Sequence, residues 1–161
     1  MSAEIFLKLD GVPGESKTSG FEDQIDVLSF SWGASNPTSV SRGGGSASGR
    51  VDMSSISIQK EVDKASPKFM EAVCWGKHFA DGTLTVRESS GDKPLEYYVL
   101  ELKQVFVDSF SVGGASQGGK PSESVSFSFA EIKLKYTAQD EKGGQGDKLE
   151  YAFNVQKNEP A

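Results

Sequence analysis

The only cysteine and the only histidine of the chain stand four residues apart, at Cys74 and His78. On one face of a helix, such a pair could act as nucleophile and base, or as two ligands of a metal ion. Gly76 interrupts the predicted helix between them, and no second histidine is present to complete a zinc site. We therefore predict that Cys74 is buried and inert on the apolar face of the helix, and that His78 lies just past the helix end.

A second candidate for chemistry is the segment Gly114–Lys120, which matches the first seven positions of a phosphate-binding loop. The eighth position should carry a hydroxyl group for magnesium, but Pro121 stands there. The residues that follow alternate like a strand, whereas a phosphate site needs the N-terminus of a helix. The segment Gly44–Arg50 is a weaker imitation of the same motif. We interpret Gly114–Lys120 as a turn.

Composition and charge narrow the function classes further. The formal net charge is −6, which argues against a nucleic-acid partner because phosphate binding needs a basic patch. None of the 23 Asp and Glu residues stands in a context that marks an acid and base pair. The first residues, MSAEIFLKLDG, lack the apolar stretch of a signal peptide, and no run reaches transmembrane length. We expect no enzyme activity, catalytic residue, cofactor, metal or membrane insertion.

The elements that must position these residues are mostly strands, because apolar and polar residues alternate between Gly-rich turns. The expected strands are Ile5–Leu9, Ile25–Trp32, Val51–Lys60, Thr83–Glu88, Leu95–Val112 (two strands or one bent one), Ser124–Tyr136 and Leu149–Val155. One helix is expected, with Ser66 as its N-cap, Pro67 in its first turn and Gly76 just past its end. We expect one domain over residues 1–161.

The strand Ser124–Tyr136 contains a change of phase. Its apolar residues occupy odd positions up to Phe129 and even positions from Ile132 onward. Side chains alternate strictly in a strand, so one face cannot hold both sets without an extra residue. The pattern predicts a β-bulge or a sharp bend near Ala130–Glu131, and regular pairing through Phe129–Ile132 would refute this prediction.

A Gly- and Ser-rich loop, Ala34–Arg50, contains Val40 as its only large apolar residue. Ordering a backbone costs about 1–2 kcal/mol per residue, which this loop cannot recover against its own core. Either the loop stays mobile or another molecule orders it, which points toward assembly.

Serines also alternate along several of the predicted strands: Ser29 and Ser31, Ser55 and Ser57, Ser109 and Ser111, and Ser124, Ser126 and Ser128. They indicate either an ordinary exterior or a smooth wall beside another surface or a passing cargo.

Several segments in succession carry a resemblance that covers Ile5 to Asn158. They are GES, VLSFSWG, SPKFMEA, GKH and SFAEIKLKY, at matching intervals. Together they make the chain similar to the haemolysin-coregulated protein (Hcp) family, which forms the inner tube of the bacterial type VI secretion system. Phe153 departs from the pattern, because a Trp would be expected there, but an aromatic residue is retained.

The resemblance implies a tail-tube-like fold: a small β-barrel of two antiparallel sheets with one flanking helix. It implies homo-hexameric rings that stack into a tube, with a contractile sheath, a spike protein and a baseplate as partners and effector toxins in the lumen. The protein would assemble in the cytoplasm and be secreted without a signal peptide. The ring-stacking loop would comprise Ser39, Ser41, Arg42, Gly43, Gly44, Gly45, Gly49 and Arg50, and an effector-contact loop would comprise Gly114, Ala115, Ser116 and Gln117.

Two other classes of function remain open from the residues alone. A monomeric β-barrel binding module, such as a carbohydrate-binding module, would use the same loops and aromatic residues. A hydrolase would need acidic or nucleophilic residues that converge in a pocket. The native mass distinguishes a monomeric binding module from a ring. A structure shows whether acidic or nucleophilic residues converge in a pocket, as a hydrolase would require.

Overall fold

The computed structural model describes residues 2–37, 50–89 and 91–161. It contains eleven strands and one helix within this part of the chain. In order they are β1 (Ala3–Leu9), β2 (Ile25–Val27), β3 (Ser29–Ser31), β4 (Ala34–Ser35), β5 (Asp52–Met53), β6 (Ile56–Glu61), α1 (Ser66–Trp75), β7 (His78–Glu88), β8 (Glu96–Gly113), β9 (Ser122–Gln139), β10 (Gln145–Asn154) and β11 (Glu159–Pro160).

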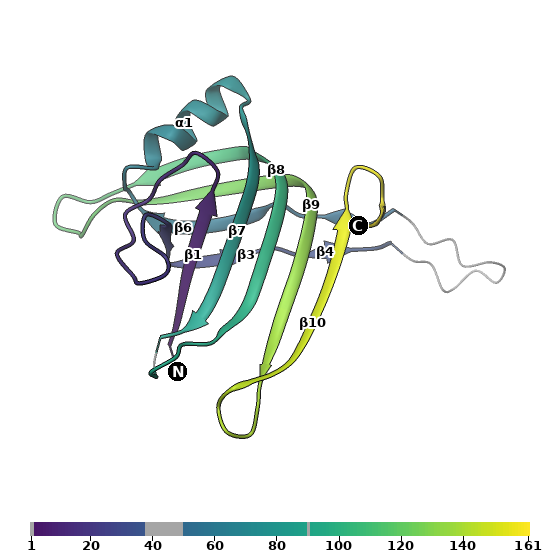
Figure 1. The fold of residues 1–161 in the computed structure, drawn as a ribbon. Coiled ribbons are helices and arrows are strands. Elements are labelled where there is room, and N and C mark those ends of the chain that lie inside the picture. Colours follow the sequence, from purple (N-terminus) through teal and green to yellow (C-terminus); the bar gives the residue numbers. More distant parts are fainter. Residues whose placement is uncertain (1, 38–49, 90) are drawn as a thin grey trace.

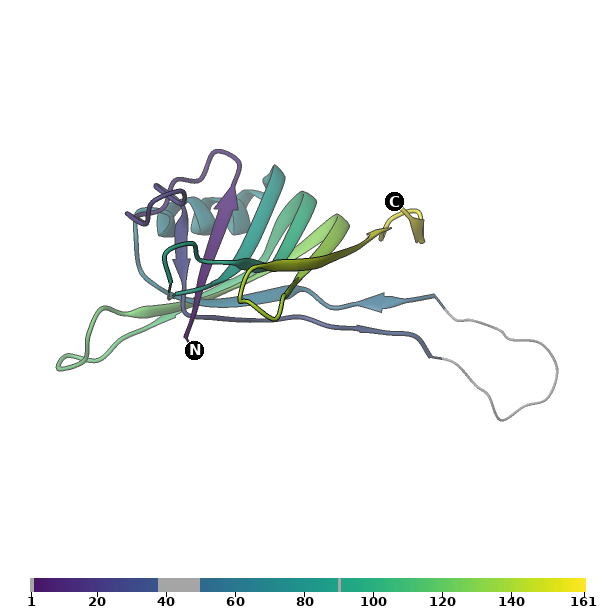
Figure 2. The same ribbon diagram turned by 60° about the horizontal axis from the view of Figure 1, so that its bottom comes forward.

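The strands form two layers that share the long pair β8 and β9 (Figure 1 and Figure 2). The first layer has the order β11-β10-β9-β8-β7-β1-β2. The second layer has the order β3-β6-β9-β8, in which the first half of β9 pairs with β6 on one side and with the second half of β8 on the other. Every pairing is antiparallel, and β4 and β5 pair with each other as a short separate ribbon. The predicted fold class, mainly β with antiparallel sheets and one helix, is confirmed.

Two predicted strands are each split in the structure. Ile25–Trp32 divides at Leu28, because β2 pairs with β1 whereas β3 pairs with β6 in the other layer. Val51–Lys60 divides into β5 and β6. In contrast, Leu95–Val112 corresponds to a single bent strand, β8.

The phase change in β9 is real, but it is not a bulge in that strand. The pairs Val105↔Phe129 and Leu102↔Ile132 keep one register, so the prediction of an extra residue at Ala130–Glu131 is wrong. The neighbouring strand β8 changes phase at the same level, where Gln104 has a φ of 52°. Figure 1 shows that β8 and β9 both bend along their length. The buried residues are Leu100, Leu102, Val105 and Val107 in β8, and Val125, Phe127, Phe129, Ala130 and Ile132 in β9.

The helix begins and ends close to the predicted residues, but its buried face is narrower. Gly76 ends α1 with a φ of 65°, whereas Ala65, not Ser66, occupies the N-cap position. Only Phe69 and Ala72 are buried within α1. Cys74 is exposed, so its predicted burial is wrong. Cys74 follows Phe69 by five residues, so its side chain is rotated by about 140° around the helix axis from that of Phe69. This rotation turns Cys74 away from the core.

A buried ion pair attaches the start of α1 to the sheet. Lys60 and Glu123 face each other across β6 and β9, and both are fully buried and in contact. Ser66 Oγ donates to Glu123 Oε1 at 2.7 Å, and Lys60 Nζ also donates to Asp63 Oδ1 at 2.9 Å. The pair therefore connects both strands with the helix N-terminus.

Breaking this ion pair should cost more stability than removing it whole. Lys60→Met leaves the Glu123 carboxylate buried without its partner, which should cost about 3–5 kcal/mol. Lys60→Met with Glu123→Leu removes both charges and should recover most of that loss. Urea denaturation of the two single variants and the double variant measures the coupling. Additive losses would contradict the account.

The corrected position of Cys74 gives a second stability prediction. Cys74→Ala should change the free energy of unfolding by less than about 0.5 kcal/mol, as expected of an exposed site. Phe69→Ala, its buried counterpart on α1, should cost about 3–5 kcal/mol. Urea denaturation compares the two, and a large loss on Cys74→Ala would mean that the thiol packs in the core.

Candidate functional site

The residues that first suggested chemistry do not form a catalytic site. Cys74 is exposed, and the His78 ring packs against Phe106 with ring centroids 5.3 Å apart. The described residues contain no group of three or more His, Cys, Asp or Glu side chains arranged to hold a metal. Gly114–Lys120 forms the turn between β8 and β9, and the strand β9 follows it where a phosphate site would need a helix.

The segment predicted as a loop, Ala34–Arg50, begins with strand β4, because Ala34 and Ser35 pair with β5, so its predicted start is wrong. Of the residues predicted to stack rings, only Arg50 is described. Ser39, Ser41, Arg42, Gly43, Gly44, Gly45 and Gly49 lie outside the described residues. Arg50 is exposed, and its Nη2 donates to the carbonyl oxygens of Val155 at 3.3 Å and Gln156 at 3.4 Å. Arg50 therefore connects the base of the loop to the turn between β10 and β11, a contact that the sequence did not indicate.

The alternating serines come together on one face of the β3-β6-β9-β8 sheet, which we call the serine wall. The strand register aligns them in two rows that cross all four strands. One row is Ser31, Ser57, Ser126 and Ser109, and the other is Ser29, Gln59, Ser124 and Ser111. Gln59 Nε2 donates to Ser124 Oγ at 2.6 Å, and Ser109 and Ser126 are hydrogen-bonded through their hydroxyls.

The serine wall is nearly free of charge. Asp108, which lies at the register shift between β8 and β9, accepts hydrogen bonds from Ser55 at 2.5 Å and Ser128 at 2.8 Å. The opposite face of the same strands carries Ile58 and Phe127 into the core. The wall is therefore a smooth surface of small hydroxyl groups, backed by an apolar core.

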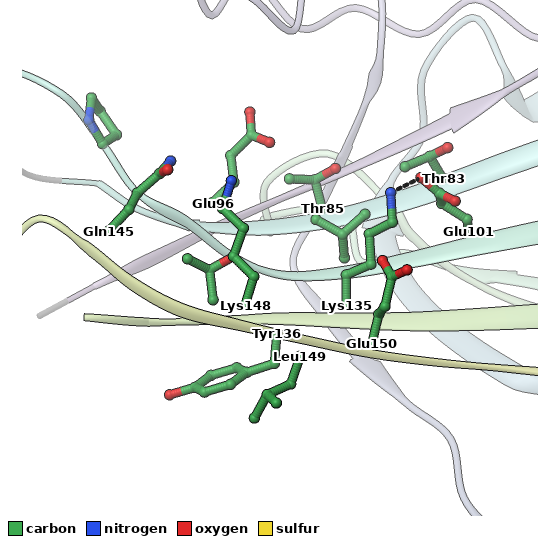
Figure 3. A pocket seen from close by; sticks show the side chains of 13 residues that line it. Thr83, Thr85, Glu96, Glu101, Lys135, Tyr136, Gln145, Lys148, Leu149 and Glu150 are labelled. Atoms are coloured by element: carbon green, nitrogen blue, oxygen red, sulfur yellow. Dashed lines mark hydrogen bonds and ion pairs between the residues drawn. The ribbon is translucent and has the colours of Figure 1, made fainter. Parts of the chain in front are cut away.

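A charged face lies on the other layer, over β8, β9 and β10. Its cross-strand pairs are Lys103 with Glu131, Glu101 with Lys133, and Lys135 with Glu150. Lys135 Nζ donates to Glu101 Oε1 at 2.6 Å, and this hydrogen bond raises the pKa of Lys135. Figure 3 shows Glu101, Lys135 and Glu150 at a cavity of about 850 Å³ that they help to line.

The carboxylates Glu101 and Glu150 of this face form cross-strand ion pairs with lysines. Glu101 contacts Lys135, and Glu150 lies 3.4 Å from the Lys133 amine. Each of these two carboxylates therefore has a lysine as its ion-pair partner. The charged face therefore lacks the converging acid and base that a hydrolase would need at these positions.

Comparison with known proteins identifies a family over most of the chain. Residues 6–136 match the family model described as "Type VI secretion system effector, Hcp". The chain belongs to the Hcp family. "Protein hcp1" of Pseudomonas aeruginosa is 36% identical over 159 residues, which cover 98% of each chain. The carbohydrate-binding alternative has no support in these findings.

Solved structures give the same family. The "Structure of a type six secretion system protein" superposes with a TM-score of 0.93 at 30% identity and covers 99% of this chain and 100% of its own. Hcp1 from Salmonella typhimurium superposes with a TM-score of 0.83 at 27% identity and covers 100% of both chains. Within the described residues, no helix of this Hcp-family chain is both long and apolar enough to span a membrane.

Proposed function

We propose that this chain closes into a homo-hexameric ring, and that rings stack into the inner tube of a type VI secretion system. A contractile sheath would drive the tube, tipped by a spike protein, from a baseplate into a target cell. The number six and these partners rest on the family. The observation from the chain itself that carries the proposal is the serine wall.

The two edges of the serine wall support ring closure. Strand β3 pairs with β6 on one of its sides, and no pairing is described on its other side. Residues 107–113 of β8 likewise pair only with β9 among the described residues, because the pairing of β7 with β8 ends at Phe106. The wall is thus open at β3 and at β8 within the described part of the chain. Open edges invite pairing with another chain, and a contact between two unlike edges repeats around a ring.

The chemistry of the wall suits the lining of a channel. Neutral hydroxyl groups give a moving polypeptide few strong contacts, because charge pairing is nearly absent and apolar area is small. We place effector toxins against this wall. Gly114, Ala115, Ser116 and Gln117 are all exposed in the turn between β8 and β9, so they are proposed as an effector-contact loop at one end of the wall.

The loop Ala34–Arg50 is proposed to act between rings. Its composition offers backbone hydrogen bonds and close approach, which suit a weaker contact than the one that closes the ring. Arg50 holds the base of the loop to the β10–β11 turn, so the loop would extend from a fixed point. The tube would assemble in the cytoplasm and be secreted without a signal peptide, and its role needs no cofactor and no catalysis.

Sedimentation of the purified protein tests ring closure. The wild type should sediment at six times the 17.3 kDa of one chain. A single-chain mass at all concentrations would contradict the proposed function, and would return the monomeric binding module to consideration.

A triple substitution separates stacking from ring closure. Replacing Gly43, Gly44 and Gly45 with Val should leave the ring mass unchanged, because the ring is closed elsewhere. It should abolish tubes in electron micrographs and abolish secretion, because Val resists the close approach that Gly permits. Dissociation of this variant to single chains would instead assign the loop to the ring interface.

A further inference from the structure

Nine large apolar side chains are exposed in the described part of the chain, and six of them fall in two separate groups. Met70, Val73 and Trp75 of α1, which flank the buried stripe of the helix on its two sides, are together called the helix patch, with 59%, 39% and 78% of each residue exposed. Tyr136 of β9 with Leu149 and Tyr151 of β10 form the overhang patch, with 45%, 66% and 60% exposed. So much apolar surface on one small chain is typical of an interaction site.

The overhang patch lies on the same face of the first layer as the buried core residues, but at the end of the sheet that reaches past the core. Tyr136 pairs with Leu149 and with Tyr98, on the same face as the buried Leu100. Figure 3 shows Tyr136 and Leu149 on the side of the sheet opposite the charged cavity. Figure 1 shows the β9–β10 hairpin reaching well beyond β3. Tyr136 and Leu149 are exposed there, whereas Tyr151, also largely exposed, borders an apolar cavity with Trp32 and Met53.

The helix patch has a similar origin. A helix that packs on a core through one stripe normally carries polar residues around the rest of its surface. Helix α1 buries only Phe69 and Ala72, yet it carries Met70 and Val73 on one flank and Trp75 toward the other. Its apolar surface is therefore wider than the core of its own chain can cover.

The two patches lie at opposite ends of the serine wall. Helix α1 packs against β8, so the helix patch lies on the side of the open β8 edge. The overhang patch lies on the side of β3, because Trp32, just after β3, donates to the Tyr98 hydroxyl at 2.8 Å and lines an apolar cavity of about 310 Å³ with Leu134 and Tyr151. Figure 1 shows α1 on one side of the second layer and the β9–β10 hairpin on the other.

We propose that the helix patch of one copy of this chain packs on the overhang patch of the next copy. This inference rests on the proposed ring and names the apolar contact that closes it. The helix patch lies on the side of the β8 edge and the overhang patch on the side of the β3 edge, so pairing of the β8 edge of one copy with the β3 edge of the next places these two sides next to each other. Because the patches differ, the contact is heterologous and repeats around the ring.

The available area fits a second copy as the occupant. At about 150–250 Å² for each large side chain, the exposed fractions of the six residues amount to on the order of 700 Å². A stable interface buries about 1,600 Å² in total, so the patches supply nearly half, and the pairing of the strand edges can supply much of the rest.

Substitutions in the two patches test the contact. Trp75→Glu and Leu149→Glu should each reduce the sedimenting species from a ring to single chains, because each places a charge in the apolar contact. Both sites are largely exposed, so circular dichroism should show an unchanged fold. Lys148→Glu is the matched control, since Lys148 is the neighbour of Leu149 on the charged face, and this variant should keep the ring. Rings that persist in both patch variants would overturn the inference.

Cross-linking identifies the two surfaces in contact. Cys74, the only cysteine, is exposed on α1 beside the helix patch. Tyr151→Cys places a second thiol in the overhang patch, and a short bismaleimide should then join neighbours into a ladder of up to six chains on a denaturing gel. The same variant with Cys74→Ala, and Lys148→Cys on the charged face, should give no ladder.

The outcomes separate the inference from the proposed function. A ladder that stops at two chains would mean that like surfaces meet, and no ladder from a protein that sediments as a ring would mean that the patches do not meet. Either result overturns this inference and leaves the ring proposal standing. A wild type that sediments as a single chain would overturn both.

Discussion

Strands β8 and β9 are 18 residues long, which is the constraint on which the rest of the structure depends. At about 3.3 Å per residue each would reach about 60 Å if straight. A compact chain of this length has a radius of gyration of about 15 Å, so no single core can back such strands from end to end. The pair bends (Figure 1), and at the level of Gln104 and Ala130 both strands change the face that they bury.

The bend gives one strand pair two different environments. Before it, β9 pairs with β6, and the outer face carries the two rows of the serine wall. After it, β9 pairs with β10, and the outer face carries Lys135, Glu101 and their partners. The inner face of the same hairpin then extends past the core and leaves Tyr136 and Leu149 uncovered. A neutral wall, a charged face and an apolar overhang thus follow from one change of partner, and together they describe a subunit of an assembly.

The sequence predicted those features that follow from local pattern. The alternation located most of the strands, Gly76 ended the helix, and Pro121 excluded the phosphate loop. The sequence could not predict the partners of each strand. The division of Ile25–Trp32 into two strands depends on two partner strands from different layers. The phase change in β9 is accommodated by a phase change in β8 at Gln104, which no pattern in the sequence marks. The serines were visible one strand at a time, whereas their alignment into rows depends on register.

The burial of Cys74 was predicted from its apolar neighbours, and the error has a physical cause. Met70 and Val73 indicated a wide buried face, but α1 covers its own core with Phe69 and Ala72 alone. Apolar residues that belong to a protein interface and apolar residues that belong to the core produce the same pattern in the sequence. The excess of apolar residues on α1 is consistent with a surface that a second copy covers, and only the structure separates the two kinds.

Images of the purified protein test the central claim most directly, because they show both closure and the channel that the serine wall would line. Electron micrographs of single particles should show closed rings with six-fold symmetry and an open centre. Single compact particles without a central opening, or open filaments of chains joined edge to edge, would contradict the account.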